Sequence, residues 1–467
     1  MKFKSIILAA GKGTRMKSKY PKVIHKVCGK EMVNHVVDTS KKSGVEETIV
    51  VLGHGAEAVR ERLSDDIITV MQTEQLGTAH AVRMAEEYIE DEDTIVVLCG
   101  DTPLIKEDTL KKLFEYHVEN NCHTTVLSTI VEDPTGYGRI IRDENGDLLK
   151  IVEQKDASEE EKLVKEINSG IYCFNGKSLK EALKEINNDN AQGEYYLPDA
   201  IKVMREKSLK VGAFAGSSIE ELMGVNSRLQ LSQAEKAMRK RINEFHMANG
   251  VTMIDPDTTY IEADVEIGND TIVYPGVNLV GKTKIGSDCI IGMNSSITDS
   301  IVGDGTEIKI STLLEAKVGE NTKVGPYAYL RPKADVGNGC KVGDFVEIKN
   351  AKFGDGSKAS HLSYIGDAEV GKNVNVGCGV VFVNYDGVHK FRSVVKDNAF
   401  IGSNSNLVAP VTVEEQGYIA TGSTITDDVP RRSLAIARQR QCIKENWMDK
   451  KEARDKKLSE EKAKNKK

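Results

Sequence analysis

The apolar residues in the first half of the chain form short runs separated by amphipathic stretches. These patterns predict strands at 5–10, 47–52, 67–71 and 94–98, and helices at 32–43, 56–63 and 78–90. This alternation is typical of a mostly parallel sheet with helices on both faces. Ligands of such sheets bind at the carboxyl ends of the strands. The chemistry of this first domain, residues 1–228, is therefore expected in the loops that follow its strands.

One longer amphipathic stretch follows at 226–249. It predicts a single helix that ends at Asn249 and Gly250, a common helix stop. We interpret residues 229–249 as a helical linker. The alternative, that this is the last helix of the first domain, changes only the position of the boundary.

From Gly250 onward the apolar residues recur every six positions. They stand at Ile285, Ile291 and Ile297, at Val318, Val324, Leu330, Val336, Val342 and Ile348, and at Ile401, Leu407, Val413, Ile419 and Ile425. Neither an α-helix nor a flat strand has this period, which predicts a parallel β-helix of hexapeptide repeats over 250–467. Shifts of register near Ser300, Lys358 and Tyr385 predict loops or altered coils.

Composition supports two different constructions in one chain of 467 residues. The chain has 40 glycines, of which 17 lie in 1–249 and 23 in the shorter stretch 250–422. Its 64 basic and 71 acidic residues give a net charge of −7, which argues against a nucleic-acid-binding surface. The tail after Trp447 carries charges of both signs and is expected to be a solvated or disordered end.

The cysteines and the N-terminus indicate a cytoplasmic protein. The eight cysteines are scattered and form no CxxC pair, which suits a reducing compartment. The first apolar run is six residues long and ends in a glycine loop. It is too short for a signal sequence or a membrane span, so no membrane insertion is expected.

A glycine loop follows the first predicted strand. Gly11 and Gly13 let the backbone turn tightly and present N–H groups to phosphates, while Lys12 and Arg15 offset the charge of a triphosphate. The loop matches neither the Walker A motif nor the dinucleotide fingerprint. Taken alone, it is equally an ordinary strand-to-helix turn.

The full string LAAGKGTRM, followed by Pro21 and Lys22, resembles the signature of sugar-phosphate nucleotidyltransferases, which implies a Rossmann-like domain. Other motifs match in order: QTEQLGTAHA, which in the resemblance reads a uracil base, YGR, NSG and GVN. The resemblance implies Lys22 and Arg15 as catalytic residues that neutralise phosphate charge. It implies nucleotide and sugar binding by Leu8, Ala9, Ala10, Gly11, Lys22, Gln72, Gly77, Thr78, Gly138, Glu153, Asn168 and Asn226.

A carboxylate at the carboxyl edge of the sheet predicts a magnesium site. Asp101 directly follows the predicted strand 94–98, where it could hold Mg²⁺. Alone, Asp101 could equally form a turn. The resemblance makes it a metal ligand and adds Asn226 as the second. Cys99 stands where some relatives have Tyr, so its side chain is assigned no role.

A second polar cluster interrupts the hexapeptide pattern. It contains Arg331, Glu347, Lys349, the block HLSYIGD that begins at His361, and the block NYDG that begins at Asn384. Acyl transfer to an amine needs a base, and imidazole titrates in the right range. The cluster is similar to that of glucosamine-1-phosphate acetyltransferases, the second half of a family of bifunctional enzymes of UDP-N-acetylglucosamine biosynthesis.

This resemblance covers nearly the whole chain apart from the tail. It implies that the β-helix is left-handed, that the protein is a homotrimer, and that His361 accepts the proton. It implies binding of the amino-sugar phosphate by Arg331, Lys349, Tyr364 and Asn375, and of acetyl-CoA by Cys378, Asn384, Tyr385, Ser403, Thr421 and Arg438. We also hypothesise that Glu347 orients His361, because both lie in the same motif block.

The resemblance implies two reactions that supply cell-wall precursors. Acetyl-CoA acetylates glucosamine 1-phosphate, and UTP then reacts with N-acetylglucosamine 1-phosphate to give UDP-N-acetylglucosamine and pyrophosphate, with Mg²⁺ as cofactor. Two alternatives remain open at this point. The chain could be a pyrophosphorylase, such as those that make ADP-glucose, whose β-helix is regulatory, or its β-helix could be only a trimerisation scaffold.

Overall fold

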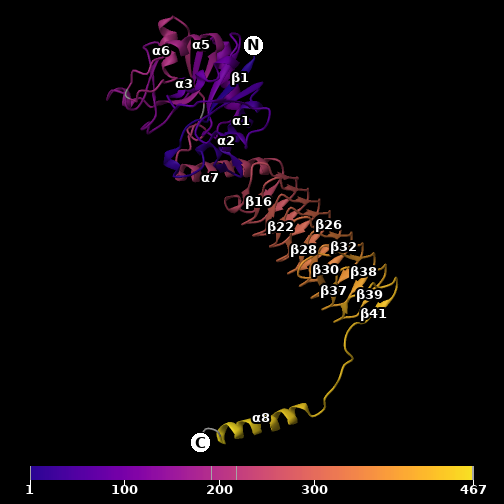
Figure 1. Cartoon of the computed structure of the whole chain (residues 1–467). Coiled ribbons are helices and arrows are strands. Elements are labelled where there is room, and N and C mark those ends of the chain that lie inside the picture. The colour runs from indigo at the N-terminus through magenta and orange to yellow at the C-terminus, as the bar shows by residue number, and fades with distance from the viewer. Residues whose placement is uncertain (1, 191, 217, 465–467) are drawn as a thin grey trace. The chain divides into compact units, whose positions relative to one another are not determined.

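The computed structural model describes residues 2–190, 192–216 and 218–464. The chain divides into two compact units, Met1–Thr283 and Lys284–Lys467 (Figure 1). Among the described residues, every helix is too short or too polar to cross a membrane.

The first unit is built on a sheet that is parallel apart from one inserted strand and a hairpin. Its order is β11 (Val211–Ala215), β7 (Thr124–Ile130), β10 (Glu166–Asn175), β6 (Thr94–Cys99), β1 (Phe3–Leu8), β4 (Glu47–Leu52) and β5 (Ile68–Met71). The pairs β1–β4, β1–β6, β4–β5 and β7–β11 are parallel. Two features were not predicted from the sequence. Strand β10 runs antiparallel to both its neighbours. It also pairs with the hairpin of β8 (Arg139–Arg142) and β9 (Leu148–Val152).

Helices cover both faces of this sheet, as the alternation of elements predicts. Successive residues of β1 point to opposite faces: Ile6 packs in one core and Ile7 in the other, and both are fully buried. The first core is covered by α3 (Thr78–Arg83), α5 (Gly176–Glu185) and α6 (Asp199–Glu206), and the second by α1 (Met32–Lys42), α2 (Ala56–Arg60) and α4 (Glu107–Glu119).

Two predicted helices are shorter than expected. The expected helix 78–90 ends at Arg83 and is followed by the separate 3₁₀ turn Glu86–Tyr88, and α2 ends at Arg60 rather than near 63. The expected linker helix is α7 (Arg228–Ala248), capped by the Ser227 hydroxyl, which accepts from the Gln230 N–H. The first unit ends with coil strands β12 (Thr252–Met253), β13 (Tyr260–Ile261), β14 (Glu266–Ile267), β15 (Ile272–Val273) and β16 (Asn278–Val280).

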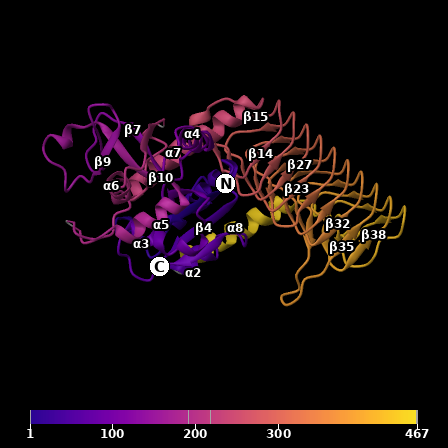
Figure 2. The ribbon, with the colours of Figure 1, turned by 90° about the horizontal axis from the view of Figure 1, so that it is seen from above.

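The second unit is a parallel β-helix with three sheets, and Figure 2 shows its coils as a row of repeated rungs. Sheet I contains β18 (Ile290–Ile291), β21 (Glu307–Ile308), β24 (Lys323–Val324), β27 (Lys341–Asp344), β30 (Lys358–His361), β33 (Asn375–Val376), β36 (Phe400–Ile401), β39 (Tyr418–Ile419) and β41 (Leu434–Ala435). Sheet II contains β19 (Ser296–Thr298), β22 (Thr312–Leu314), β25 (Tyr329–Leu330), β28 (Glu347–Lys349), β31 (Tyr364–Gly366), β34 (Val381–Val383), β37 (Asn406–Val408) and β40 (Thr424–Ile425). Sheet III contains β17 (Lys284–Ile285), β20 (Ile301–Val302), β23 (Lys317–Val318), β26 (Asp335–Val336), β29 (Lys352–Phe353), β32 (Ala368–Val370), β35 (Ser393–Val395) and β38 (Val411–Val413).

The apolar residues that recur every six positions fill the core of the β-helix. Val318, Val324, Leu330, Val336, Val342 and Ile348 are all at most 3% exposed. Most coils are 16 to 18 residues long, since Glu307 pairs with Lys323, Lys323 with Lys341, and Lys341 with Lys358. Asn375 instead pairs with Phe400, 25 residues later. The extra residues form a small hairpin at the shift expected near Tyr385, closed by a bridge between Tyr385 and Lys390.

The charged tail forms helix α8 (Trp447–Lys464), drawn in yellow in Figure 1, and none of its residues is buried. The tail is therefore solvated, as its composition predicts, although it is helical.

Candidate functional sites

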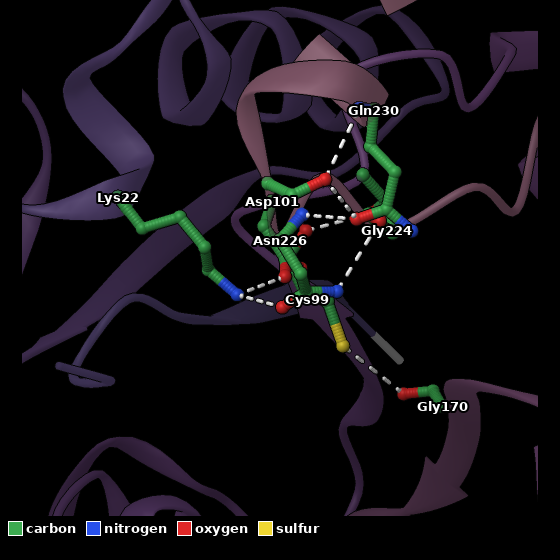
Figure 3. Close-up of polar contacts among 9 residues, drawn as sticks. Lys22, Cys99, Asp101, Gly170, Gly224, Asn226 and Gln230 are labelled. Carbon is green, nitrogen blue, oxygen red and sulfur yellow. Dashed lines mark hydrogen bonds and ion pairs between the residues drawn. The ribbon is translucent and has the colours of Figure 1, made fainter. Parts of the chain in front are cut away.

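Lys22 is the centre of a polar cluster at the carboxyl edge of the first sheet (Figure 3). Its ammonium donates to Asp101 Oδ2 and, at 2.8 Å, to Asn226 Oδ1. Lys22 lies in a 3₁₀ turn, Asp101 follows β6, and Asn226 precedes α7. Three segments that are distant in sequence therefore meet at one ammonium group. The side chains of Lys22 and Asp101 are only 15% and 17% exposed.

Further hydrogen bonds hold the segments that carry the two oxygens accepting from Lys22. The Val225 N–H donates to the Asp101 carbonyl at 2.9 Å, and the Asn226 N–H donates to Gln230 Oε1 at 2.9 Å. The Asn226 amide nitrogen donates to the Gly224 carbonyl at 3.2 Å. This bond leaves Asn226 Oδ1 to face the ammonium.

The glycine loop passes beside Lys22. Gly13 has a φ of +58°, and a Cβ at this position would lie 2.6 Å from Lys22 Cβ. Gly11 has no atom within 4 Å of its hypothetical Cβ, so its backbone faces open space. Leu8 ends β1, and Ala9 and Ala10 hydrogen-bond through their backbones to Val51 and His54. Arg15 is exposed, and no described residue forms an ion pair with its guanidinium.

The segment expected to read a nucleotide base is held by its own side chains. Gln72 is 3% exposed, and its Nε2 donates to the Gly77 carbonyl at 3.2 Å and to His80 Nδ1 at 3.0 Å. Gly77 has a φ of +113°, and a Cβ there would lie 2.5 Å from the Tyr195 carbonyl oxygen. Thr78 Oγ1 accepts from the Leu197 N–H at 3.0 Å. The sequence assigned no role to His80, which here helps to orient Gln72.

Gly138, Glu153 and Asn168 lie together, as the resemblance implies for the sugar pocket. The Asn168 N–H donates to the Gly138 carbonyl at 2.9 Å, and a Cβ at Gly138 would lie 3.1 Å from Glu153 Oε1. Burial, followed by the charges of Asp156 and Asp199, raises the pKa of Glu153. Glu153 also lines a cavity of about 420 Å³ with these two carboxylates.

The second cluster pairs His361 with an aspartate one coil earlier. Asp344 and His361 are register partners at the ends of β27 and β30, and His361 Nδ1 lies 2.7 Å from Asp344 Oδ1. A hydrogen bond from its own backbone N–H and a second one from His361 lower the pKa of Asp344. Because a carboxylate can only accept, Nδ1 donates and Nε2 is left as the basic nitrogen. The His361 side chain is 55% exposed.

The hypothesis that Glu347 orients His361 is wrong in this structure. Glu347 belongs to β28 of sheet II, and its Oε1 lies 2.7 Å from Arg331 Nη1. His361 ends a strand of sheet I, and its register partner in the preceding coil is Asp344. Glu347 therefore positions Arg331, and this ion pair raises the pKa of Arg331.

Most residues expected to bind the amino-sugar phosphate lie along sheet II. Arg331 follows β25, Lys349 ends β28 and Tyr364 begins β31, which are neighbouring strands. Asn375 is separate from them, because it begins β33 in sheet I. Lys390 joins the set from the inserted hairpin, and the nearby ammonium of Lys349 lowers its pKa. Lys390 could not be predicted from the sequence, because the fold of the hairpin brings it back to Lys349.

Most residues expected to bind acetyl-CoA follow successive strands of sheet I. Cys378, Ser403, Thr421 and Arg438 come after β33, β36, β39 and β41, respectively. Backbone bonds stack these turns: the Asn404 N–H donates to the Cys378 carbonyl at 2.7 Å, and the Gly422 N–H to the Ser403 carbonyl at 2.9 Å. They form one edge of the β-helix, which follows the strands of the sheet that carries His361.

Asn384 and Tyr385 lie apart from that edge, after β34 of sheet II. The Asn384 amide donates to Asp367 Oδ2 at 2.5 Å and to Tyr364 Oη at 3.4 Å. Tyr385 is 54% exposed on the hairpin. Asn384 thus contacts the expected phosphate set rather than the sheet I edge.

Comparison with known proteins gives full-length relatives. Residues 4–218 match the nucleotidyl transferase family model, and residues 315–350 match the bacterial transferase hexapeptide (six repeats) model. The chain is 76% identical to the bifunctional protein GlmU of Clostridioides difficile over 97% of this chain and 99% of that protein. It is 60% identical to the bifunctional protein GlmU of Alkaliphilus oremlandii, with the same coverage. A crystal structure of UDP-glucose pyrophosphorylase complexed with UDP-glucose covers 52% of this chain and 100% of that one, with a TM-score of 0.44 and 21% identity, a likeness too weak to assign the fold.

Proposed function

The chain belongs to the family of bifunctional GlmU proteins, and from this premise we propose which of its residues carry each of its two activities. It is a transferase that acetylates glucosamine 1-phosphate and transfers a uridylyl group to N-acetylglucosamine 1-phosphate. The two alternatives left open by the sequence, a regulatory β-helix and a bare scaffold, therefore do not apply.

Uridylyl transfer is assigned to the Lys22 cluster. An oxygen of the sugar 1-phosphate attacks the α-phosphorus of UTP, and the bond from that phosphorus to the bridging oxygen breaks to release pyrophosphate. Both reactants are anions, so the reaction needs positioning and charge neutralisation rather than a side-chain nucleophile. Lys22 and Arg15 supply positive charge. The open backbone around Leu8, Ala9, Ala10 and Gly11 approaches the phosphates.

Asp101 and Asn226 fit a magnesium site. Their oxygens converge on one ammonium group, so a single cation can reach both. Oxygen donors suit Mg²⁺, which binds through one or two carboxylates plus substrate phosphates. No three His, Cys, Asp or Glu side chains form a metal cluster in the described part of the chain. When bound, Mg²⁺ would offset the charge on the triphosphate.

The base and sugar are assigned to the two neighbouring loops. Gln72, Gly77 and Thr78 bind the uracil, with Gln72 held by His80. Gly138, Glu153 and Asn168 bind the sugar, whose hydroxyl groups can donate to the Glu153 carboxylate. The close approach of the Gly138 and Glu153 loops supports this assignment.

Acetyl transfer is assigned to His361, positioned by Asp344. The neutral amino group of glucosamine 1-phosphate forms a bond to the thioester carbonyl carbon, and the Nε2 atom of His361 accepts the proton that the nitrogen loses as this bond forms. The carbon–sulfur bond breaks, and the coenzyme A thiolate leaves and is protonated by the imidazolium. Asp344 stabilises the protonated ring through its bond to Nδ1.

The substrates of this reaction are assigned to the two neighbouring sheets. Arg331, Lys349 and Tyr364 bind the phosphate of the amino sugar, with Asn375 from the adjacent sheet. Acetyl-CoA lies along the sheet I edge and the hairpin, against Cys378, Asn384, Tyr385, Ser403, Thr421 and Arg438. The Cys378 side chain takes no part in the chemistry, because direct transfer needs no acyl-cysteine.

A homotrimer built through the β-helix is part of the proposal. The exposed faces of this helix carry stacked aromatic pairs, Tyr327 with Phe345 at 5.3 Å and Phe400 with Tyr418 at 4.5 Å between ring centroids. Exposed apolar surface of this kind favours association. We assign residues 1–228 to uridylyl transfer, 229–249 to the linker and 250–467 to acetyl transfer, in a cytoplasmic enzyme that binds no nucleic acid.

The observation that carries the proposal is that the chain holds two separate polar clusters, one around Lys22 and one around His361. Asp101→Ala should abolish pyrophosphate release from UTP and N-acetylglucosamine 1-phosphate and leave coenzyme A release unchanged. His361→Ala should do the reverse. If either variant lost both activities while remaining folded, the assignment of separate sites would be wrong.

A further inference from the structure

The Lys22 ammonium occupies the position that the proposed function assigns to the magnesium ion. Its ammonium donates to Asp101 Oδ2 and Asn226 Oδ1, the two oxygens assigned to Mg²⁺ (Figure 3). An ammonium and a metal ion at the same two oxygens repel each other, so the binding of one opposes the binding of the other. Lys22 is also assigned to the triphosphate. If it leaves Asp101 and Asn226, all three of its N–H donors become available to the phosphates.

The surroundings explain why a cation is needed there before any metal arrives. The Asp101 side chain is 17% exposed, and the only described ion pair of its carboxylate is with Lys22. A carboxylate largely removed from water is costly unless an opposite charge compensates it. The Asn226 amide is held by Gly224 so that its oxygen faces the same point. Lys22 thus keeps both oxygens aimed at one position.

The backbone of Lys22 is fixed, whereas its ammonium can move. Val23 and Ile24, the next residues of its 3₁₀ turn, are buried, and Gly13 packs against its Cβ. The four-carbon stem of lysine allows the charged end to swing while the backbone stays in place. The glycine loop that faces the phosphates lies beside this stem.

We propose that Lys22 is a resident cation of the metal site, which Mg²⁺ displaces, and that the displaced ammonium then pairs with the triphosphate. The proposal rests on the magnesium site of the proposed function. It predicts that Lys22 opposes metal binding in the absence of nucleotide. It also predicts positive coupling between metal and nucleotide, because the phosphates give the displaced ammonium a new partner, and such coupling is reciprocal.

The test measures Mn²⁺ binding to the full chain without nucleotide, by electron paramagnetic resonance of free Mn²⁺. Lys22→Met should bind Mn²⁺ about tenfold more tightly than the wild type, because the competing charge is gone. Lys26→Met removes the same charge four residues later, at a side chain that is 62% exposed, and should stay within about twofold of the wild type.

Two results distinguish a failure of the proposed displacement from a failure of the proposed magnesium site. If Asp101→Ala loses Mn²⁺ binding while Lys22→Met binds no more tightly than the wild type, the displacement is overturned and the magnesium site stands. If Asp101→Ala binds Mn²⁺ as the wild type does, the magnesium site is overturned and the displacement falls with it.

A measurement on the wild type covers the case in which Lys22→Met does not fold. Crystals grown with a chelator and then soaked in Mn²⁺ should show the metal by anomalous scattering at Asp101 and Asn226, with the Lys22 ammonium more than 4 Å from Asp101. A bound metal with Lys22 still hydrogen-bonded to Asp101 would overturn the proposal.

Discussion

Gly13→Ala should impair uridylyl transfer through Lys22. The alanine Cβ would lie 2.6 Å from Lys22 Cβ, whereas ordinary contacts begin near 3.4 Å, so the two segments must separate by about 0.8 Å. Lys22 Cβ is next to the backbone and cannot swing away. The left-handed φ of +58° adds a cost of about 1–2 kcal/mol for a residue with a side chain.

These two effects should be measured separately. The strain should lower the melting temperature by about 2–8 °C. A displacement approaching 1 Å at a positioning group should lower kcat/KM for uridylyl transfer by about 100-fold. Acetyl transfer should be unchanged, because His361 lies in the other compact unit.

Gly11→Ala is the matched control in the same loop. Its Cβ would meet nothing within 4 Å and its φ is not positive, so its melting temperature should stay within about 1 °C of the wild type. Wild-type melting and uridylyl transfer in Gly13→Ala, or an equal loss of stability in Gly11→Ala, would contradict a role of the Gly13–Lys22 contact.

The remaining predictions concern the base, the metal and the pH dependence of stability. Asp344→Asn should lower kcat for coenzyme A release by about 10-fold or more, because the charge that stabilises the protonated His361 is lost. Glu347→Gln should mainly raise KM for glucosamine 1-phosphate, because Glu347 pairs with Arg331. Equal effects of the two variants on kcat would contradict the pairing of His361 with Asp344. Chelation with EDTA should stop pyrophosphate release and leave coenzyme A release intact, and loss of both would contradict the metal assignment. Burial, followed by the charge of a neighbouring histidine, lowers the pKa of His117 from 6.5 to about 4. As the pH falls, the unfolded chain therefore binds this proton before the folded chain does, and folding stability is lost between pH 6.5 and pH 4. In urea titrations the stability advantage of the wild type over His117→Gln should therefore shrink by about 3 kcal/mol between pH 7 and pH 4, while the exposed His54→Gln serves as the control and should show no such change.

The six-residue period predicted the β-helix well because each apolar residue has one possible place, the narrow core. Val324, Leu330 and Val336 are buried for this reason. The antiparallel course of β10 was not predictable in the same way. Its direction depends on pairing with β6 and β7, which lie far away in the sequence.

The partner of His361 was missed although the sequence held a usable signal. A coil of 17 residues places position 344 directly beside position 361, and Asp344 is found there. Closeness in the motif favoured Glu347, which lies only three residues later but on the next sheet. In a β-helix, residues one coil apart are neighbours, and residues three apart can face different directions.

The Lys22 cluster shows a different limit. Resemblance indicated Lys22, Asp101 and Asn226 separately, but no sequence period relates residues so far apart. Only the fold of the sheet and the start of α7 shows that one ammonium bridges the two oxygens.

The most direct test of the two-activity account is the stoichiometry of one reaction mixture. The purified chain is supplied with glucosamine 1-phosphate, acetyl-CoA, UTP and Mg²⁺, and coenzyme A, pyrophosphate and UDP-N-acetylglucosamine are measured together. The account predicts one coenzyme A and one pyrophosphate for each UDP-N-acetylglucosamine formed. Pyrophosphate release from added N-acetylglucosamine 1-phosphate, with no coenzyme A release from glucosamine 1-phosphate, would contradict it.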